Sequence, residues 1–77
     1  MAVGAYVMIR TSPGAGYTAA KAIKKIKGVS SAHSVTGPID VIAVVEAADF
    51  KALGDLVVNK LQKVEGVRST ISCVIAE

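Results

Sequence analysis

Five residues have types that could together bind a small charged molecule. The set consists of Thr36, Gly37, Asp40, Thr70 and Ser72. Asp40 follows a glycine-proline turn and directly precedes the apolar run Val41 to Val45. A carboxylate pairs with an ammonium group, whereas hydroxyls and the free N–H of a glycine turn can receive a carboxylate, so the set suits a small zwitterion. The alternative is structural: Asp40 bonds its own turn as an Asx motif.

The residue types needed for catalysis or metal binding are sparse. His33 is the single histidine and has no acidic neighbour in sequence, so it offers no nucleophile–base arrangement. Cys73 is the single cysteine, which excludes an internal disulfide, and we interpret it as a small buried hydrophobic residue. The loop Ser12 to Gly16 lacks the spacing of phosphate-binding and dinucleotide-binding loops and is interpreted as a plain turn. We expect no enzyme activity, no metal and no cofactor.

The composition indicates one small domain with more apolar surface than its interior can hold. The chain has 77 residues, expected to form a single domain over 1–77, with 52% hydrophobic residues and a mean hydropathy of +0.52. A chain of this size buries only about 60% of its surface on folding. The surplus is expected to meet a partner subunit rather than a membrane, since the longest apolar run is far shorter than the roughly 20 residues of a spanning helix. The start MAVGAYVMIR lacks signal-peptide features, and we expect a cytoplasmic protein.

The net charge of +3 raises the question of nucleic-acid binding. Four lysines cluster in one segment: Lys21, Lys24, Lys25 and Lys27. Aromatic residues that could stack on bases are few, namely Tyr6, Tyr17 and Phe50. We therefore interpret the lysines as a solvated helix face and expect no direct nucleic-acid contact.

The order of periodic segments is strand, helix, strand, strand, helix, strand. Strands are predicted over Val3 to Arg10, Val29 to Thr36, Ile39 to Ala47 and Val67 to Ala76. The first helix is predicted over Tyr17 to Lys27, with the apolar stripe Ala19, Ala22, Ile23 and Ile26. The second helix is predicted to follow an N-cap at Asp49, with the stripe Phe50, Leu53, Val57, Leu61 and Val64. Gly28 and Gly66 are placed to end the two helices.

An internal repeat supports this order. KIKGVSSAHS (25–34) aligns with KVEGVRSTIS (63–72) at the 38-residue offset between Gly28 and Gly66. Two similar βαβ halves with right-handed crossovers intercalate into one four-stranded antiparallel sheet. We therefore predict an α+β, ferredoxin-like βαββαβ fold with two helices on one face of the sheet.

Strand alternation divides the apolar residues between the two faces of the predicted sheet. The residues predicted beneath the helices are Ala5, Val7, Ile9, Val41, Ala43, Val45, Val67, Ile71, Cys73 and Ile75. The other face is predicted to carry Tyr6, Met8, Ile42, Val44, Thr70, Ser72 and Val74. Its apolar members are too numerous to leave in water. We expect Tyr6, Met8, Ile42, Val44 and Val74 to form a dimer face that packs sheet against sheet.

Two segments resemble the effector-binding domain of the Lrp/AsnC transcription regulators, often called the RAM domain. They are VTGPIDVIAVVEA (35–47) and EGVRSTISCVIAE (65–77). The specific parts are a T-G-x-x-D turn, formed by Thr36, Gly37 and Asp40, and a last-strand pattern GV-x-x-T-x-[TS] that starts at Gly66. The similarity covers essentially the whole chain. Full-length members carry a helix-turn-helix module before this domain, whereas here Met1 runs almost directly into the first strand, so the resemblance implies a stand-alone member.

The resemblance also implies a function. Such domains bind amino acids at interfaces between dimers, assemble into rings and can act on full-length regulators by co-assembly. The implied effector pocket is lined by Thr36, Gly37, Pro38, Ile39, Asp40, Thr70 and Ser72. Ile39 stands where the family often has an aromatic residue, as in G-P-Y-D, and this difference bears on side-chain specificity.

Two alternatives share features of this fold. ACT regulatory domains carry Asp-x-Pro-Gly in their first loop, where this chain has Thr11-Ser12-Pro13-Gly14 and lacks the acid. Small dimeric α/β-barrel enzymes, such as cofactor-free monooxygenases, share the sheet-to-sheet dimer. Those enzymes need a cavity lined with aromatic and polar groups, and this chain has no tryptophan.

Overall fold

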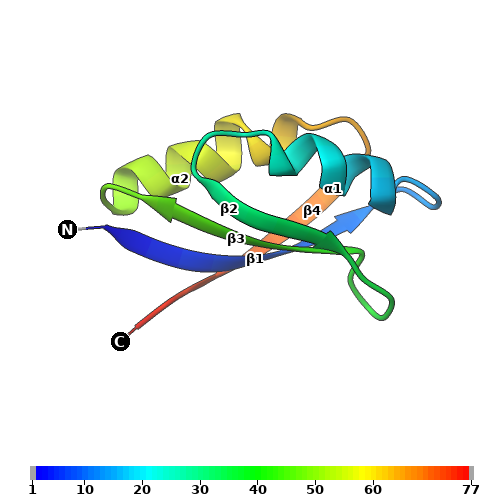
Figure 1. The fold of residues 1–77 in the computed structure, drawn as a ribbon, viewed down its shortest axis with the longest axis horizontal. Helices are drawn as coiled ribbons and strands as arrows, with labels where there is room; N and C mark the ends of the chain where they lie inside the picture. Colours follow the sequence, from blue (N-terminus) through cyan, green and yellow to red (C-terminus); the bar gives the residue numbers. More distant parts are fainter. Residues whose placement is uncertain (1, 77) are drawn as a thin grey trace.

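The chain folds into one antiparallel sheet with both helices on the same face (Figure 1). The computed structural model describes residues 2–76. The elements are β1 (Val3–Thr11), α1 (Gly16–Lys24), β2 (Val29–Ser34), β3 (Val41–Ala47), α2 (Phe50–Asn59), the short 3-10 helix η1 (Leu61–Lys63) and β4 (Val67–Val74). The strands lie in the order β2-β3-β1-β4, with all neighbouring pairs antiparallel. The predicted ferredoxin-like βαββαβ fold is confirmed.

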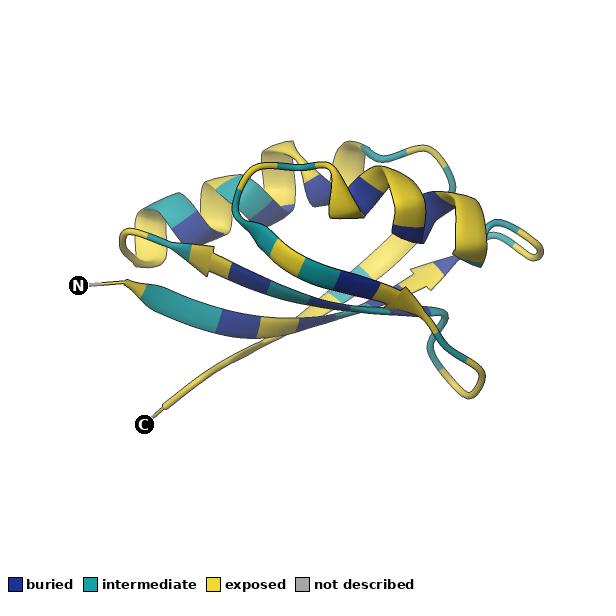
Figure 2. Cartoon of the chain, viewed as in Figure 1, coloured by how far each residue is buried: buried dark blue, intermediate teal, exposed yellow. Residues whose placement is uncertain are grey.

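The core lies between the helices and the two central strands, where the period-2 and period-3.6 apolar patterns meet (Figure 2). Alternate residues of β1 and β3 are fully buried, as predicted: Ala5, Val7, Ile9, Val41, Ala43 and Val45. The helical side contributes Ala19, Ala20, Ile23, Leu53, Val57 and Leu61. In the helices the predicted stripe is partly wrong, because Ala20 is buried in place of Ala22 and Phe50 is 69% exposed.

The start of α2 agrees with the prediction, but both helices end earlier than predicted: α1 ends at Lys24, with Lys25 as its C-cap, so Gly28 and Gly66 lie in the turns that follow and not at the helix ends. The Asp49 carboxylate accepts a hydrogen bond from the backbone N–H of Ala52 at 2.8 Å, which confirms the predicted N-cap of α2. Gly28, in the turn after α1, has φ 101°, and Gly66, before β4, has φ 94°, a region that favours glycine. α2 ends at Asn59 rather than near Val64, and η1 completes the segment. Neither helix within residues 2–76 is long and apolar enough to cross a membrane.

A β-bulge at the start of β4 shifts its register against β1. Arg10 lies opposite Ser69, but Thr11 lies opposite Val67, so Arg68 is the additional residue. Side chains of a strand alternate between faces, and one additional residue reverses the face of every residue beyond it. Val67, before the bulge, packs against the core as predicted.

The predicted faces of the rest of β4 are therefore wrong. Thr70 lies opposite Ile9, Ser72 opposite Val7 and Val74 opposite Ala5, and these partners of β1 all point to the helices. The residues that do face away from the helices are Ile71 and Cys73, opposite Met8 and Tyr6, with Ile75 beside Gly4. Cys73 is exposed and not the buried residue we expected.

The other edge strand, β2, has a matching bulge. Val29 lies opposite Val45 and Ser31 opposite Val44, so Ser30 is the additional residue. Ser30 corresponds to the bulged residue of β4 at the 38-residue offset of the sequence repeat. The repeat thus encodes the same backbone irregularity in both edge strands, where bulges blunt the edges against unwanted pairing.

Candidate functional site

Asp40 lies where the β2–β3 hairpin meets the end of β1. Its Oδ2 accepts a hydrogen bond from the backbone N–H of Thr11 at 2.8 Å. Its backbone N–H donates to the carbonyl of Ile9 at 3.0 Å, and its carbonyl accepts from the Val35 N–H at 2.9 Å. The carboxylate thus accepts the hydrogen bond of the Thr11 N–H, which has no backbone acceptor in β3 because β3 begins only at Val41. The Asx alternative, in which Asp40 bonds its own turn, is wrong.

The second carboxylate oxygen of Asp40 has no hydrogen-bond partner among the described residues. Asp40 is partly exposed, and no buried side-chain polar atom within residues 2–76 lacks a hydrogen-bond partner. Because no hydrogen bond to Oδ1 is present in this part of the chain, and Oδ1 is not among buried atoms without a partner, Oδ1 is not fully buried. The ion pair in the described residues joins Lys51 to Asp55, so Asp40 has no cationic partner there. A carboxylate with one oxygen unbonded and no cationic partner is suited to bind an ammonium group.

The turn residues of the predicted pocket form an exposed hairpin that projects from the body of the protein (Figure 1). Thr36, Gly37 and Pro38 are exposed, and Ile39 is partly buried. Gly37 has φ 139°, and a Cβ atom added there would meet no atom within 4 Å. Glycine is thus required at this position by backbone conformation rather than by space.

Thr70 and Ser72 lie on the opposite side of β1 from Asp40. Thr70 is opposite Ile9, which in turn is opposite Val41, the residue after Asp40. Two strand spacings of about 4.8 Å therefore separate the Thr70 backbone from that of β3. The Thr70 hydroxyl already accepts a hydrogen bond from Gln62 Nε2 at 2.9 Å. One protomer therefore does not bring Asp40 and the two hydroxyls of β4 into a single pocket.

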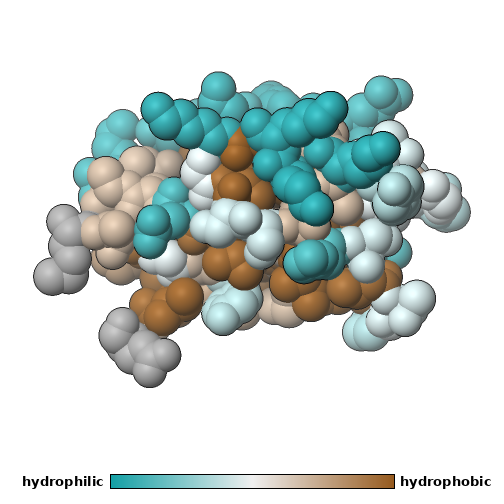
Figure 3. Space-filling model, viewed as in Figure 1, coloured by the Kyte–Doolittle hydropathy of each residue, from teal (hydrophilic) through white to brown (hydrophobic). Residues whose placement is uncertain are grey.

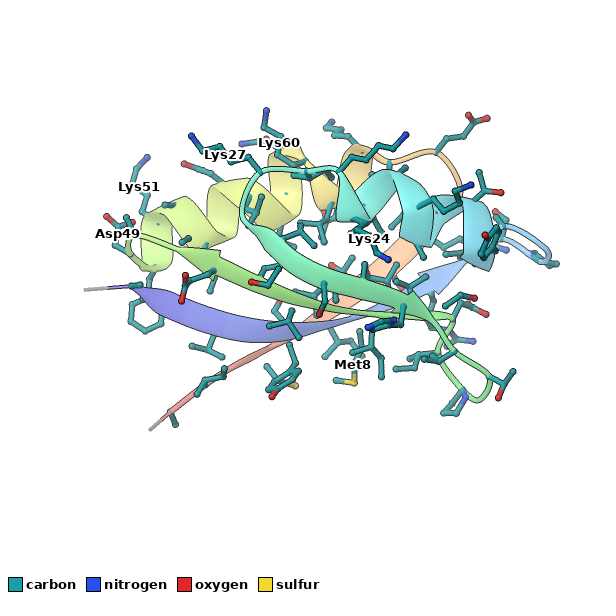
Figure 4. The ribbon with its side chains drawn as sticks, in the orientation of Figure 1. Met8, Lys24, Lys27, Asp49, Lys51 and Lys60 are labelled. Atoms are coloured by element: carbon teal, nitrogen blue, oxygen red, sulfur yellow. The ribbon has the colours of Figure 1, made fainter. Side chains whose placement is uncertain are left out.

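The sheet face turned away from the helices carries three rows of side chains that cross the strands. The first row is His33, Ile42, Met8 and Ile71; the second is Ser31, Val44, Tyr6 and Cys73; the third is Glu46, Gly4 and Ile75. Figure 4 shows Met8 pointing from the sheet away from the helices. Tyr6 is 51% exposed and Ile71 55%, so large apolar side chains meet solvent in a single protomer. Four members of the predicted dimer face lie here, but Val74 does not.

The described residues contain no metal-ligand cluster. No group of three or more His, Cys, Asp or Glu side chains gathers between residues 2 and 76. His33 and Cys73 lie in different rows of the open sheet face, on opposite edge strands. Neither has an acidic partner in the hydrogen bonds of this part of the chain.

Two residues that hydrogen-bond to the predicted ligand-binding side chains were not predicted from the sequence: Thr11, which donates to Asp40, and Gln62, which donates to Thr70. Thr11 is 29 residues from Asp40, and its contribution is a backbone N–H that any residue type except proline supplies. Gln62 is 8 residues from Thr70, in a segment predicted as continuous helix. The contact between Thr11 and Asp40 could not be predicted from the spacing of nearby residues. The bulged residues Ser30 and Arg68 occupy matching positions of the repeat, but the alignment of the two segments does not by itself identify a bulge.

Comparison with known sequences gives a match over nearly the whole chain. The profile of the family described as "Lrp/AsnC ligand binding domain" matches residues 4–77. An uncharacterized HTH-type transcriptional regulator of Pyrococcus furiosus is 38% identical over 73 residues, which make up 91% of this chain and 49% of that protein. The chain spans about half the length of the curated relatives it matches.

Solved structures show the same fold. The protein TTHA0845 from Thermus thermophilus is similar with a TM-score of 0.90 at 31% identity, covering 97% of this chain and 94% of that one. The transcriptional regulator NMB0573 from Neisseria meningitidis, solved as a complex with L-Met, has a TM-score of 0.84 at 19% identity. That match covers 97% of this chain and 50% of the other, and its likeness concerns the fold alone.

Proposed function

The chain belongs to the family of Lrp/AsnC ligand-binding domains, and we propose that it binds a free amino acid as an oligomeric, non-enzymatic module. Its relatives are HTH-type transcriptional regulators, and the family is regulatory. The free Oδ1 of Asp40 is the observation that carries the proposal. In this role it accepts the ammonium group of the effector, while Oδ2 holds the bond to Thr11 and keeps the carboxylate in place.

The hairpin turn and a second subunit complete the proposed pocket. The Gly37 backbone and the Thr36 side chain are exposed in the turn that leads to Asp40 and, in this proposal, donate to the effector carboxylate, with Pro38 and Ile39 as apolar neighbours. Thr70 and Ser72 lie beyond β1 in the same protomer. We propose that the hydroxyls of Thr70 and Ser72 from a neighbouring subunit contact the ligand.

The open sheet face supports the oligomeric part of the proposal. The large apolar side chains on this face would be removed from water if the sheets of two subunits pack face to face. Such a face is self-complementary, so one copy of this chain can also pair with the equivalent face of a relative. Co-assembly with full-length Lrp/AsnC regulators would allow the effector to influence transcription without any enzymatic step.

A thermal-shift screen of the standard amino acids on wild type, Asp40→Asn and Asp55→Asn tests the proposal. A ligand at about 100 times its Kd stabilises the folded state by about 2.7 kcal/mol. For a domain of this size that corresponds to a rise in Tm of about ten degrees or more. Asparagine keeps an oxygen acceptor for the Thr11 N–H and removes the charge, so Asp40→Asn should lose the shift while Asp55→Asn retains it.

Two results would contradict the proposal. One is the absence of a shift with any amino acid at about 20 mM, far above the micromolar-to-millimolar Kd range that a few charge-assisted bonds support. The other is a shift that is equally large in Asp40→Asn and in wild type.

A further inference from the structure

A hollow lined by lysines lies between α1 and the edge strand β2. Asp40 is not among its lining residues, and of the open sheet face only His33, on the edge strand, also lines it. The hollow has a volume of about 420 Å³ and is lined by Tyr17, Ala20, Lys21, Lys24, Lys25, Ala32, His33 and Ser34. Ala20 is 5% exposed and Ala32 2% exposed, so two small side chains form its floor. Larger residues at either position would fill the space. The hollow therefore exists because alanines meet where the helix crosses the strand.

The charges around this hollow are all of one sign. Its charged lining residues are three lysines, and no carboxylate lines it. The ion pair within residues 2–76 is Lys51–Asp55, so Lys21, Lys24 and Lys25 have no acidic partner in this part of the chain. Figure 4 shows Lys24 extending from α1 toward β2, whereas Lys27 and Lys60 point away from the sheet. Lysines in a last turn also stabilise a helix C-terminus, but that effect does not require a hollow.

The remaining lining groups suit a planar, partly apolar ligand. Tyr17 is 69% exposed, and Lys21 Nζ lies 5.4 Å from the centre of its ring. Lys21 thus covers one face of the tyrosine ring, and a planar group can stack only on the opposite face. The Ser34 hydroxyl adds a donor that can contact a phosphate or a ribose. The volume falls in the range of about 300–1,000 Å³ that small-molecule sites occupy.

We propose that this hollow binds a phosphorylated small molecule of the nucleotide class, with its phosphates on the lysines and its base against Tyr17 and the alanine floor. Several negative charges on one compact group match three unpaired ammonium groups. The hydrophilic surface that Figure 3 shows along the helix layer would by itself suit any polyanion. The concave shape and the apolar floor favour a small ligand over a DNA duplex, which contacts charged residues across an extended surface.

Fluorescence titration with a nucleotide that carries a fluorescent ribose label tests the site on the complete chain. Wild type is expected to bind with a Kd below about 1 mM. The double variant Lys21→Gln/Lys24→Gln should bind at least about tenfold more weakly. The matched control Lys51→Gln/Lys60→Gln changes the net charge equally, outside the hollow, and should bind within about twofold of wild type.

Competition experiments distinguish the contribution of the base from that of the phosphates. An Asp40 variant separates this site from the proposed amino-acid site. ATP should displace the probe at lower concentration than inorganic triphosphate, because only ATP contacts Tyr17, and Tyr17→Ala should reduce this difference. Asp40→Asn should leave probe binding unchanged, since Asp40 does not line the hollow.

Three outcomes would overturn the inference. The first is no binding of the probe, and the second is an equal loss in both double-lysine variants, which would indicate diffuse charge attraction. The third is displacement by duplex DNA but not by ATP, which would assign the lysines to nucleic acid instead.

Discussion

The carboxylate of Asp40 and the backbone nitrogen of Thr11 lie 2.8 Å apart across 29 residues of sequence. This bond joins the β2–β3 hairpin to the end of β1, beside the bulge that shifts β4. Thr11 is 8% exposed, so water has little access to replace the acceptor. Asp40 therefore has a structural role in the protomer in addition to the ligand contact we propose for it.

The Asp40–Thr11 bond predicts that Asp40→Ala destabilises the protein more than Asp40→Asn. Alanine leaves the buried Thr11 N–H without an acceptor, at a cost of about 1–3 kcal/mol, whereas the asparagine side-chain oxygen can replace Oδ2. Urea unfolding of the two variants without ligand measures the difference in free energy of unfolding. Equal losses in both variants would show that charge, and not the hydrogen bond, matters at this position.

The β4 bulge predicts that Ile71 and Val74 have different effects on assembly. Both are exposed in the protomer, at 55% and 41%, but Ile71 lies on the open sheet face and Val74 on the helix side. Ile71→Glu would place a charge in the proposed sheet-to-sheet interface and should produce monomers, whereas Val74→Glu should leave the assembly intact. Sedimentation velocity on the two variants gives the answer. Dissociation by Val74→Glu alone would refute the assignment of faces.

Two glycines should respond in opposite directions to alanine. Gly28 has φ 101°, and a Cβ there would lie 3.1 Å from Leu56 Cδ2 and 3.3 Å from the Glu46 carbonyl oxygen. Gly28→Ala should therefore lower the free energy of unfolding by about 1–3 kcal/mol. Gly54 is inside α2, with nothing within 4 Å of an added Cβ.

Gly54→Ala is the matched control for Gly28→Ala. It should stabilise the protein by about 0.5–1 kcal/mol through its higher helix propensity. Thermal unfolding of both variants compares them directly, and stabilisation by Gly28→Ala would mean that the left-handed turn is not needed.

The N-cap of α2 predicts that Asp49→Ala costs about 1 kcal/mol of stability. The Asp49 carboxylate accepts from the Ala52 N–H, a helix-start donor without an intrahelical partner. Asp55→Ala removes an equal charge from the same helix but breaks only the exposed pair with Lys51, so it should cost no more than about 0.5 kcal/mol. Chemical denaturation of the two variants should rank them in this order; the reverse order would be inconsistent with capping.

Local patterns in the sequence were sufficient to predict the element order, the sheet with helices on one face, the N-cap at Asp49 and the glycine turns that lead into β2 and β4. Each depends on a period or a residue type within a few positions. The buried residues of β1 and β3 followed from the same periodicity, and the T-G-x-x-D turn indicated the family. The repeat around Gly28 and Gly66 also carried the two edge bulges, although its alignment alone does not identify a bulge.

The direction in which β4 presents its side chains, and the bond that Asp40 makes, depend on strands far apart in sequence. One additional residue at Arg68 reversed the faces of Thr70, Ser72 and Val74, because a strand's side chains repeat every second residue and its register depends on the neighbouring strand. The Thr11 N–H that Asp40 binds is a backbone group, which carries no residue-type signal. Local sequence therefore specifies the order and approximate positions of the elements, whereas contacts between distant segments specify the register of β4 and which polar groups keep a protein partner.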